Sequence, residues 1–239
     1  MKRLWLLLMC LCAILAVRPL YAAESDEAER LREAATILDE TMNVQEKAIP
    51  ASILEKAEAI VVCPSVLKAG FGIGGQHGRC VMSARNREAG AWSPPAFLTV
   101  NGGSFGAQIG AQATDLILVV MNRRGLENLL KNEFKVGADA SVAAGPVGRS
   151  AEVATDIQFR AEILSYSRSR GLFAGVTLNG SVIKEDEDAN SRFYGRPVSN
   201  RDLIDQTPRP VGTAVVSFMR RGPDDWPVPR RGCCLPRLY

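Results

Sequence analysis

The chain has 239 residues, of which 46% are hydrophobic and 23% are charged, and its formal net charge is +3. Residues 1–23 contain three basic residues and no acid, so the remainder of the chain has a net charge of zero. This balance argues against a general nucleic-acid-binding protein, which needs a strongly basic face. The length is sufficient for one well-filled core with appendages.

Residues 1–23 have the three parts of a secretory signal peptide. Two basic residues near the start precede an apolar run from Leu4 to Val17, and the small residues Ala22 and Ala23 follow. The run is shorter than the roughly 20 apolar residues that span a bilayer. We therefore expect cleavage after Ala22 or Ala23 and export to the periplasm, with a retained membrane anchor as the alternative.

Residues 24–47 are predicted to form an amphipathic helix, which Ser25 can cap. Its apolar stripe has the 3–4 spacing of a helix and consists of Ala28, Leu31, Ala35, Leu38 and Met42. The opposite face is mostly acidic, whereas helices that lie on membranes are rich in Lys and Arg. We therefore expect this helix to pack on its own domain rather than on a membrane. A second short helix is expected to begin near Pro50.

Glycine-rich strand segments follow. AIVVCP is predicted to be a short strand that stops at Pro64, and residues 69–85 are predicted to form a hairpin or bent strands. Residues 95–122 contain three strand-like runs, of which the last, DLILVVM, is continuously apolar and therefore central. Cys63 and Cys80 lie on either side of a glycine-rich turn. We expect them to form a disulfide across adjacent strands in an oxidising compartment.

The second half of the chain is predicted to alternate short strands and helices. Asn122 can cap a short helix. A strand pair or bent strand is expected at 134–148, a hairpin with arms at 163–167 and 172–178, and a helix at 183–194 that ends at Gly195. The basic, proline-rich tail at 196–239 is expected to be partly disordered, with one further strand at GTAVVSFM.

Glycine within a strand usually marks a bulge, a bend or a close backbone approach. Strongly curved sheets are built with such bulges and kinks. The repeated glycine-rich strands therefore predict an α+β fold. We expect a curved antiparallel sheet, barrel-like or sandwich-like, with N-terminal helices and short flanking helices.

The sequence offers little for catalysis. The single histidine, His77, lies in a predicted turn without a nearby acid, so a hydrolase that uses it is the weakest hypothesis. GPVGR at 145–149 is expected to be a tight turn, with a phosphate-binding nest as the alternative. Asp115 is a candidate partner of Lys68 or Arg149. We expect no catalytic residue, no metal site and no cofactor.

Four segments together resemble a SYLF domain, in that family's order: VVCPSVLKAGFGIGGQHGRCVMSAR, FLTVNGGSFGAQIGAQATDLILVVMN, KVGADASVAAGPVGR and LSYSRSRGLFAGVTLNGSVIKEDEDANSRFYG. The resemblance implies a SYLF-like domain over residues 48–195. It also implies lipid binding, because eukaryotic SYLF proteins are linked to phosphoinositide membranes and exported bacterial relatives are described as lipid-binding. Fungal relatives also bind actin.

We therefore expect a non-enzymatic lipid-binding protein of the bacterial cell envelope, with a phospholipid of phosphatidylinositol type or a membrane surface as its partner. The candidate lipid contacts are Phe71, Phe105, Leu172 and Phe173 for acyl chains, and Lys68, Arg149, Arg168 and Arg170 for headgroups. The alternative is a structural or protein-interaction module, of the actin-binding type found in eukaryotic relatives, without lipid specificity. In that case the basic tail with Cys233 and Cys234 is expected to matter most.

Overall fold

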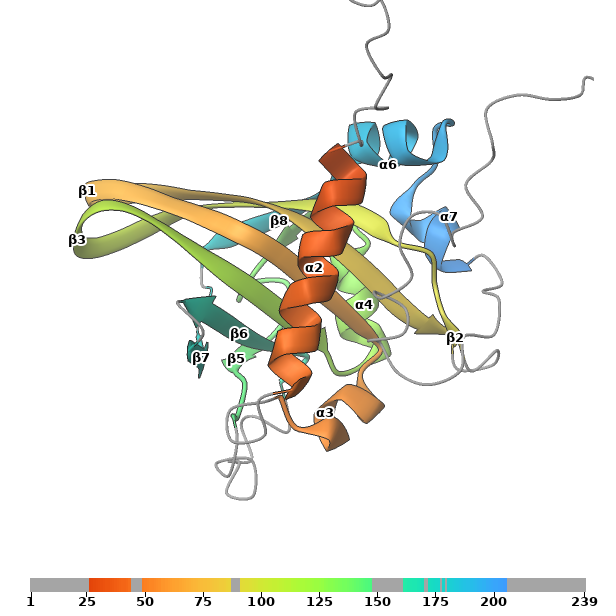
Figure 1. The fold of residues 1–239 in the computed structure, drawn as a ribbon, viewed down its shortest axis with the longest axis horizontal. Helices are drawn as coiled ribbons and strands as arrows, with labels where there is room; N and C mark the ends of the chain where they lie inside the picture. Colours follow the sequence, from red (N-terminus) through yellow and green to blue (C-terminus); the bar gives the residue numbers. More distant parts are fainter. Residues whose placement is uncertain are drawn as a thin grey trace, which may run out of the picture.

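The computed structural model describes residues 26–43, 49–86, 91–147, 161–169, 172–176, 178 and 180–205 (Figure 1). The helices are α2 (Asp26–Asn43), α3 (Ala51–Lys56), α4 (Arg123–Leu129), α6 (Glu187–Tyr194) and α7 (Asn200–Asp205). The strands are β1 (Ala59–Asn86), β2 (Ala91–Trp92), β3 (Ala96–Val120), β4 (Glu133–Lys135), β5 (Val142–Ala144), β6 (Ile163–Ser169), β7 (Leu172–Gly175) and β8 (Ser181–Glu185).

The frame of the fold is a long two-stranded ribbon. β1 and β3 pair in antiparallel register from Ala59↔Val120 to Met82↔Ala96. The ribbon turns back on itself, as Figure 1 shows on its left side. Cys63 and Cys80 meet where the two limbs of β1 cross, and they form a disulfide with their Cα atoms 4.0 Å apart. The predicted pair is therefore present, but it joins two parts of one strand instead of two adjacent strands.

The crossing of the two limbs requires a residue without a side chain. A Cβ atom added to Gly78 would lie 2.7 Å from Cγ2 of Val66, closer than real Cβ atoms approach a neighbour. Gly78 therefore allows the later limb of β1 to pass directly over the earlier one. This close backbone approach is one of the uses of strand glycines that the sequence predicted.

The first strand was expected to stop at Pro64, but β1 continues through this proline. The register shifts between Cys63 and Val66, and Ser65 there has a φ of 49°. Such a bulge leaves residues out of the hydrogen-bonded ladder, so a proline without an N–H is tolerated. Of the two alternatives at 69–85, the structure has the bent strand and not the hairpin, because β1 continues through these residues. The three runs expected at 95–122 are not separate, because β3 also continues as one bent strand.

The ribbon carries the other strands on the free edge of β3. The first half of β3 pairs with β8, which pairs with β4, and the second half pairs with β6. β7 pairs with β6 in antiparallel fashion and so confirms the predicted hairpin, whereas β5 pairs with β6 in parallel. The eight strands form one strongly curled half-barrel. The predicted α+β fold with a curved, predominantly antiparallel sheet is confirmed.

The helices cover this sheet and share its core. α2 lies across β1 in Figure 1, and one hydrophobic cluster includes Leu31 of α2, Leu126 of α4, Phe193 of α6 and Leu203 of α7. The expected packing of the N-terminal helix on its own domain is therefore confirmed. Leu116–Val120 in β3 is buried throughout, as expected of a strand covered on both faces. No helix within the described ranges is long and apolar enough to cross a membrane.

The predicted helix at 183–194 is partly wrong. Its first residues form β8, because Ile183 is fully buried between Val100 and Phe134 of the neighbouring strands. α6 begins only after Asp186, whose Oδ1 accepts a hydrogen bond of 3.1 Å from the backbone N–H of Ala189. The predicted cap of α4 is confirmed, since Oδ1 of Asn122 accepts a 2.8 Å bond from the N–H of Gly125.

The predicted signal peptide and the predicted strand at 212–219 lie outside the described residues, as do Cys233 and Cys234.

Candidate interaction surface

The predicted lipid contacts do not gather around one described site. Arg149 and Arg170 lie outside the described residues. Phe71 and Phe105 occupy backbone positions near the turn of the ribbon, where Phe71 pairs with Ile109 and Ile73 with Phe105. Leu172 and Phe173 occupy positions in β7, on the hairpin beside β6. The side chains that are described belong to Lys68, on β1, and Arg168, on β6.

Arg168 forms ion pairs within the fold. Its Nε lies 3.0 Å from Oδ2 of Asp115, the residue opposite it on β3, and its Nη1 contacts a carboxylate oxygen of Glu40 on α2. The guanidinium-bearing side chain is only 17% exposed. Asp115 also accepts a 3.0 Å hydrogen bond from the N–H of Ser65. Among the described residues, Asp115 therefore pairs with Arg168 and not with the expected Lys68, while the alternative partner Arg149 lies outside those residues. The charge of Arg168 is compensated locally.

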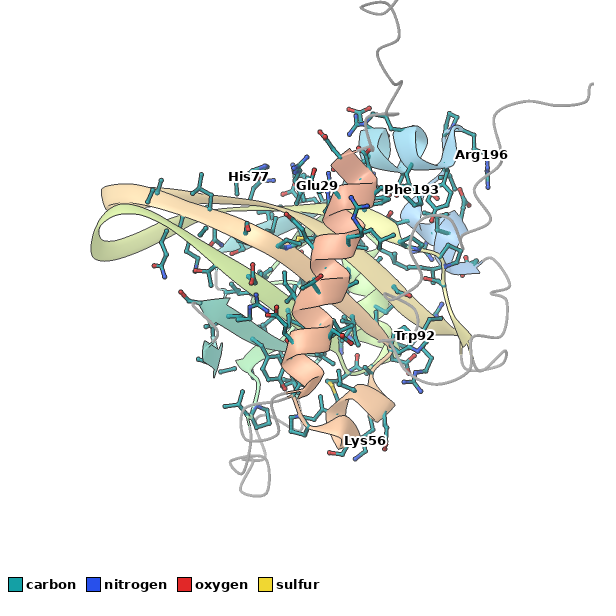
Figure 2. All side chains as sticks on the ribbon, viewed as in Figure 1. Glu29, Lys56, His77, Trp92, Phe193 and Arg196 are labelled. Atoms are coloured by element: carbon teal, nitrogen blue, oxygen red, sulfur yellow. A yellow bond between two sulfur atoms is a disulfide. The ribbon has the colours of Figure 1, made fainter. Side chains whose placement is uncertain are left out.

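This ion pair lies in a groove between α2 and the ribbon. The groove has a volume of about 500 Å³ and is lined by Glu29, Arg32, Glu33, Thr36, Ile37, Pro64, Ser65, Asp115 and Arg168. Glu29, labelled in Figure 2, and Glu33 are both exposed residues of α2. With Glu40 beside Arg168, acids outnumber arginines around the groove. The surface is therefore net acidic.

An apolar strand face continues from this groove along the ribbon. Asp115 and Ala113 are two residues apart on β3 and so face the same side of the sheet. Ala113 pairs with Leu67, and Ala111 pairs with Ala69, on that same face. Leu67 is 50% exposed and is the one large hydrophobic side chain that is exposed among the described residues. We call this exposed set, Leu67, Ala69, Ala111 and Ala113, the ribbon face.

The sequence predicted neither the groove nor the ribbon face. The sequence predicted strands in this part of the chain, but it could not tell which face of the sheet would remain uncovered. The acidic face of the first helix was visible in the sequence. That signal was sufficient to find Glu29 and Glu33, although not their neighbours on the ribbon.

Other polar groups that could take part in chemistry are hydrogen-bonded or buried within the fold. His77 lies within β1, not in the predicted turn, and its Nδ1 is 2.7 Å from Oδ1 of Asn101 on the paired strand. No group of three His, Cys, Asp or Glu side chains suited to a metal ion occurs among the described residues. The hydroxyl groups of Tyr194 and Tyr166 are buried, and burial raises the pKa of both.

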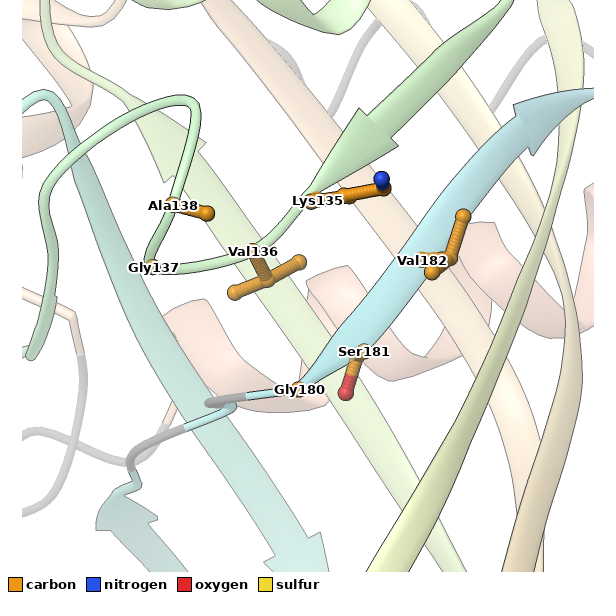
Figure 3. Close-up of a pocket in the computed structure, with 7 residues that line it drawn as sticks. All are labelled: Lys135, Val136, Gly137, Ala138, Gly180, Ser181 and Val182. Atoms are coloured by element: carbon orange, nitrogen blue, oxygen red, sulfur yellow. The ribbon is translucent and has the colours of Figure 1, made fainter.

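A second hollow, of about 410 Å³, lies between the ends of β4 and β8 (Figure 3). Its lining is mainly backbone and small side chains, and Lys135 is the one charged residue among those that line it. The N–H of Val136 donates a 2.8 Å hydrogen bond to the carbonyl of Ser181, and the Ser181 hydroxyl accepts a bond from the Gln76 amide. These contacts close the sheet around the hollow and provide no acid–base pair.

Comparison with known proteins identifies the family. A family model described as Ysc84, Las17-binding protein actin regulator, matches residues 101–220, which is half of the chain. This match begins within β3 and includes β4 to β8, α6 and α7. It therefore includes one half of the ribbon and the strands that lie on the free edge of β3.

Several eukaryotic proteins are similar over a larger part of the chain. An SH3 domain-containing protein of Schizosaccharomyces pombe is 37% identical over 69% of this chain and 38% of its own length. The human SH3 domain-containing YSC84-like protein 1 is 34% identical over 75% of this chain and 54% of its own. LAS seventeen-binding protein 3 of Saccharomyces cerevisiae is 33% identical over 69% of this chain and 36% of its own. The chain thus matches between about a third and a half of each of these relatives, and it belongs to the Ysc84 family, whose SYLF domain its sequence resembles.

Proposed function

We propose that this protein is a non-enzymatic protein-interaction module of the kind used by actin regulators. The observation that carries the proposal is the match of residues 101–220 to the Las17-binding actin-regulator family. A relative of known name, LAS seventeen-binding protein 3, is itself named for a protein partner. The matched residues include most of β3 and the strands β4 to β8 of the curled sheet, so the proposal assigns the interaction to the folded domain.

The charge of the described surface also favours a protein partner over an anionic membrane. Peripheral binding to anionic lipid relies on clusters of Lys and Arg beside apolar side chains. Here the exposed Leu67 lies beside a groove with Glu29, Glu33 and Asp115. Arg168, which was predicted to bind a headgroup, is paired with Asp115. The comparisons thus support the interaction module better than the lipid-binding expectation.

Sedimentation distinguishes these two functions. The mature chain, residues 24–239, is spun with actin filaments and, in parallel, with vesicles of phosphatidylcholine alone or with phosphatidylinositol added. Saturable pelleting with filaments is the expected result. Pelleting with vesicles and not with filaments would overturn the proposal in favour of lipid binding, and pelleting with neither would overturn its actin-binding form.

Export remains a separate proposal that rests on residues 1–23. Expression of the full chain in a bacterium followed by osmotic release of the periplasm tests it. We expect the released protein to have the mass of a chain that begins at Ala23 or Glu24. A full-length protein that stays with the membrane or the cytoplasm contradicts this expectation.

A further inference from the structure

The ribbon face is left uncovered although it continues a covered surface. α2 packs on β1 and contributes Leu31 and Leu38 to the core. Beyond the groove, the same side of the ribbon carries Leu67, which is 50% exposed, with Ala69 beside it. On an ordinary soluble surface a single exposed leucine needs no explanation. Here, however, it is flanked by exposed alanines on both paired strands, which makes an apolar strip two strands wide.

Charge around this strip indicates what could cover it. The adjoining groove presents the exposed carboxylates of Glu29 and Glu33 from α2, whereas Asp115 of β3 is paired with Arg168. The two arginines of the groove are Arg32 and Arg168, and Arg168 is already paired with Asp115 and Glu40. An acidic rim beside an apolar strip complements a segment in which basic residues flank apolar ones. Such complementarity sets partner choice and orientation more than it sets affinity.

We propose that the ribbon face and the groove beside it form a docking surface for a basic segment of a partner protein that carries leucine-like side chains between Lys or Arg residues. The apolar side chains lie on Leu67 and Ala113, and the basic groups reach the carboxylates of Glu29 and Glu33. This inference rests on the proposed function, since it specifies the surface and the partner chemistry of the same interaction module. A second copy of the chain fits less well, because the surface would then meet its own acidic rim.

The test uses fluorescence anisotropy with two labelled peptides. In the first, lysines flank a pair of leucines; in the second, glutamates replace the lysines. We expect the mature chain to bind the lysine peptide saturably and the glutamate peptide not at all. Equal binding of both peptides overturns the proposal, because it removes the role of the acidic rim. Binding should also weaken as salt rises, since exposed ion pairs are screened.

Variants then locate the site. Glu29→Lys with Glu33→Lys is expected to weaken lysine-peptide binding about tenfold, because two attractive contacts become repulsive. The matched control, Glu55→Lys with Asp205→Lys, changes the net charge equally at two exposed positions outside the groove. It should change affinity about twofold or less. Leu67→Ser removes the main apolar contact without touching the core and should weaken binding about fivefold. Equal affinities of the groove and control variants overturn the proposal.

Two further measurements distinguish the docking surface from a dimer interface and from the proposed function. Light scattering after size exclusion reports whether the native chain is a dimer that Leu67→Ser dissociates, which would assign the ribbon face to a second copy and overturn the proposal. Actin sedimentation of the groove variant separates this inference from the proposed function. If no lysine peptide binds but filaments are still pelleted by native chain and groove variant alike, the docking surface is refuted and the interaction module stands. If the lysine peptide binds while the protein does not pellet with filaments, the docking surface stands and the actin-binding form of the proposed function is refuted.

Discussion

Removing the Cys63–Cys80 disulfide should cost a large part of the stability of the fold. The bond closes a loop with a sequence separation of 17 residues. The chain-entropy relation for a loop of this size gives about 3 kcal/mol at 25 °C, most of it through the unfolded state, which loses a constraint. A domain has only about 5–15 kcal/mol of stability in total. The loss corresponds to a fall in melting temperature of about 6–12 °C.

The experiment compares three forms of residues 24–239 in a background in which Cys233 and Cys234 are replaced by serine, so that thiol exchange is prevented. The forms are the oxidised protein, the reduced protein and the Cys63→Ala, Cys80→Ala double variant. Urea unfolding is followed by tryptophan fluorescence, for which the buried Trp92 is a suitable reporter. We expect the reduced protein to lose about 3 kcal/mol, and the double variant to lose somewhat more, because both buried sulfur atoms leave a small cavity.

A loss of less than about 1 kcal/mol in the reduced form, with an unchanged dependence on urea, would refute this reasoning. It would mean that the crossing of the two limbs of β1 is already present in the unfolded chain, so that the crosslink removes little entropy. A steeper dependence on urea after reduction would support it. The unfolded chain then exposes more surface because the loop is open.

Three other changes test the packing of the fold by thermal or urea unfolding. Gly78→Ala should destabilise the protein by about 1–3 kcal/mol because the new methyl group would lie 2.7 Å from Val66; the matched control Gly103→Ala, which meets nothing within 4 Å, should be near neutral, and equal losses would contradict the crossing. Tyr166→Phe should be neutral or stabilising by up to about 1 kcal/mol, since the buried Tyr166 hydroxyl has no hydrogen-bond partner among the described residues, whereas a clear loss would reveal one. Burial raises the pKa of Glu185, so its carboxylate disfavours folding and stability should fall as pH rises from the ordinary pKa of glutamate through the raised value. Glu185→Gln should therefore gain melting temperature at neutral pH and lose that advantage in acid, and an advantage that persists in acid would contradict the assignment.

Local patterns identified most of the elements correctly. The first helix has its apolar stripe in register with the core, and Asn122 caps α4 as its side chain and position predicted. Strand glycines predicted a curved sheet, because a residue without a side chain permits bends that others resist. Cys63 and Cys80 were correctly paired from their positions on either side of such a bend. The sequence also indicated the family, because four of its segments resemble a SYLF domain in the order found in that family.

The path of the ribbon and the nature of its surface depended on contacts between residues far apart in the chain. Pro64 predicted the end of a strand. In the structure β1 continues past it, because a bulge at Ser65 accommodates the proline and pairing with β3 resumes at Val66. Ile183 was assigned to a helix by its neighbours and is held in a strand by burial between Val100 and Phe134. Arg168 was expected to meet a lipid headgroup, yet Asp115 lies opposite it across the sheet. In each case the conformational free energy that a few neighbouring residues favour is small compared with the free energy gained by burial and strand pairing. Which residues meet is therefore determined only in the folded chain.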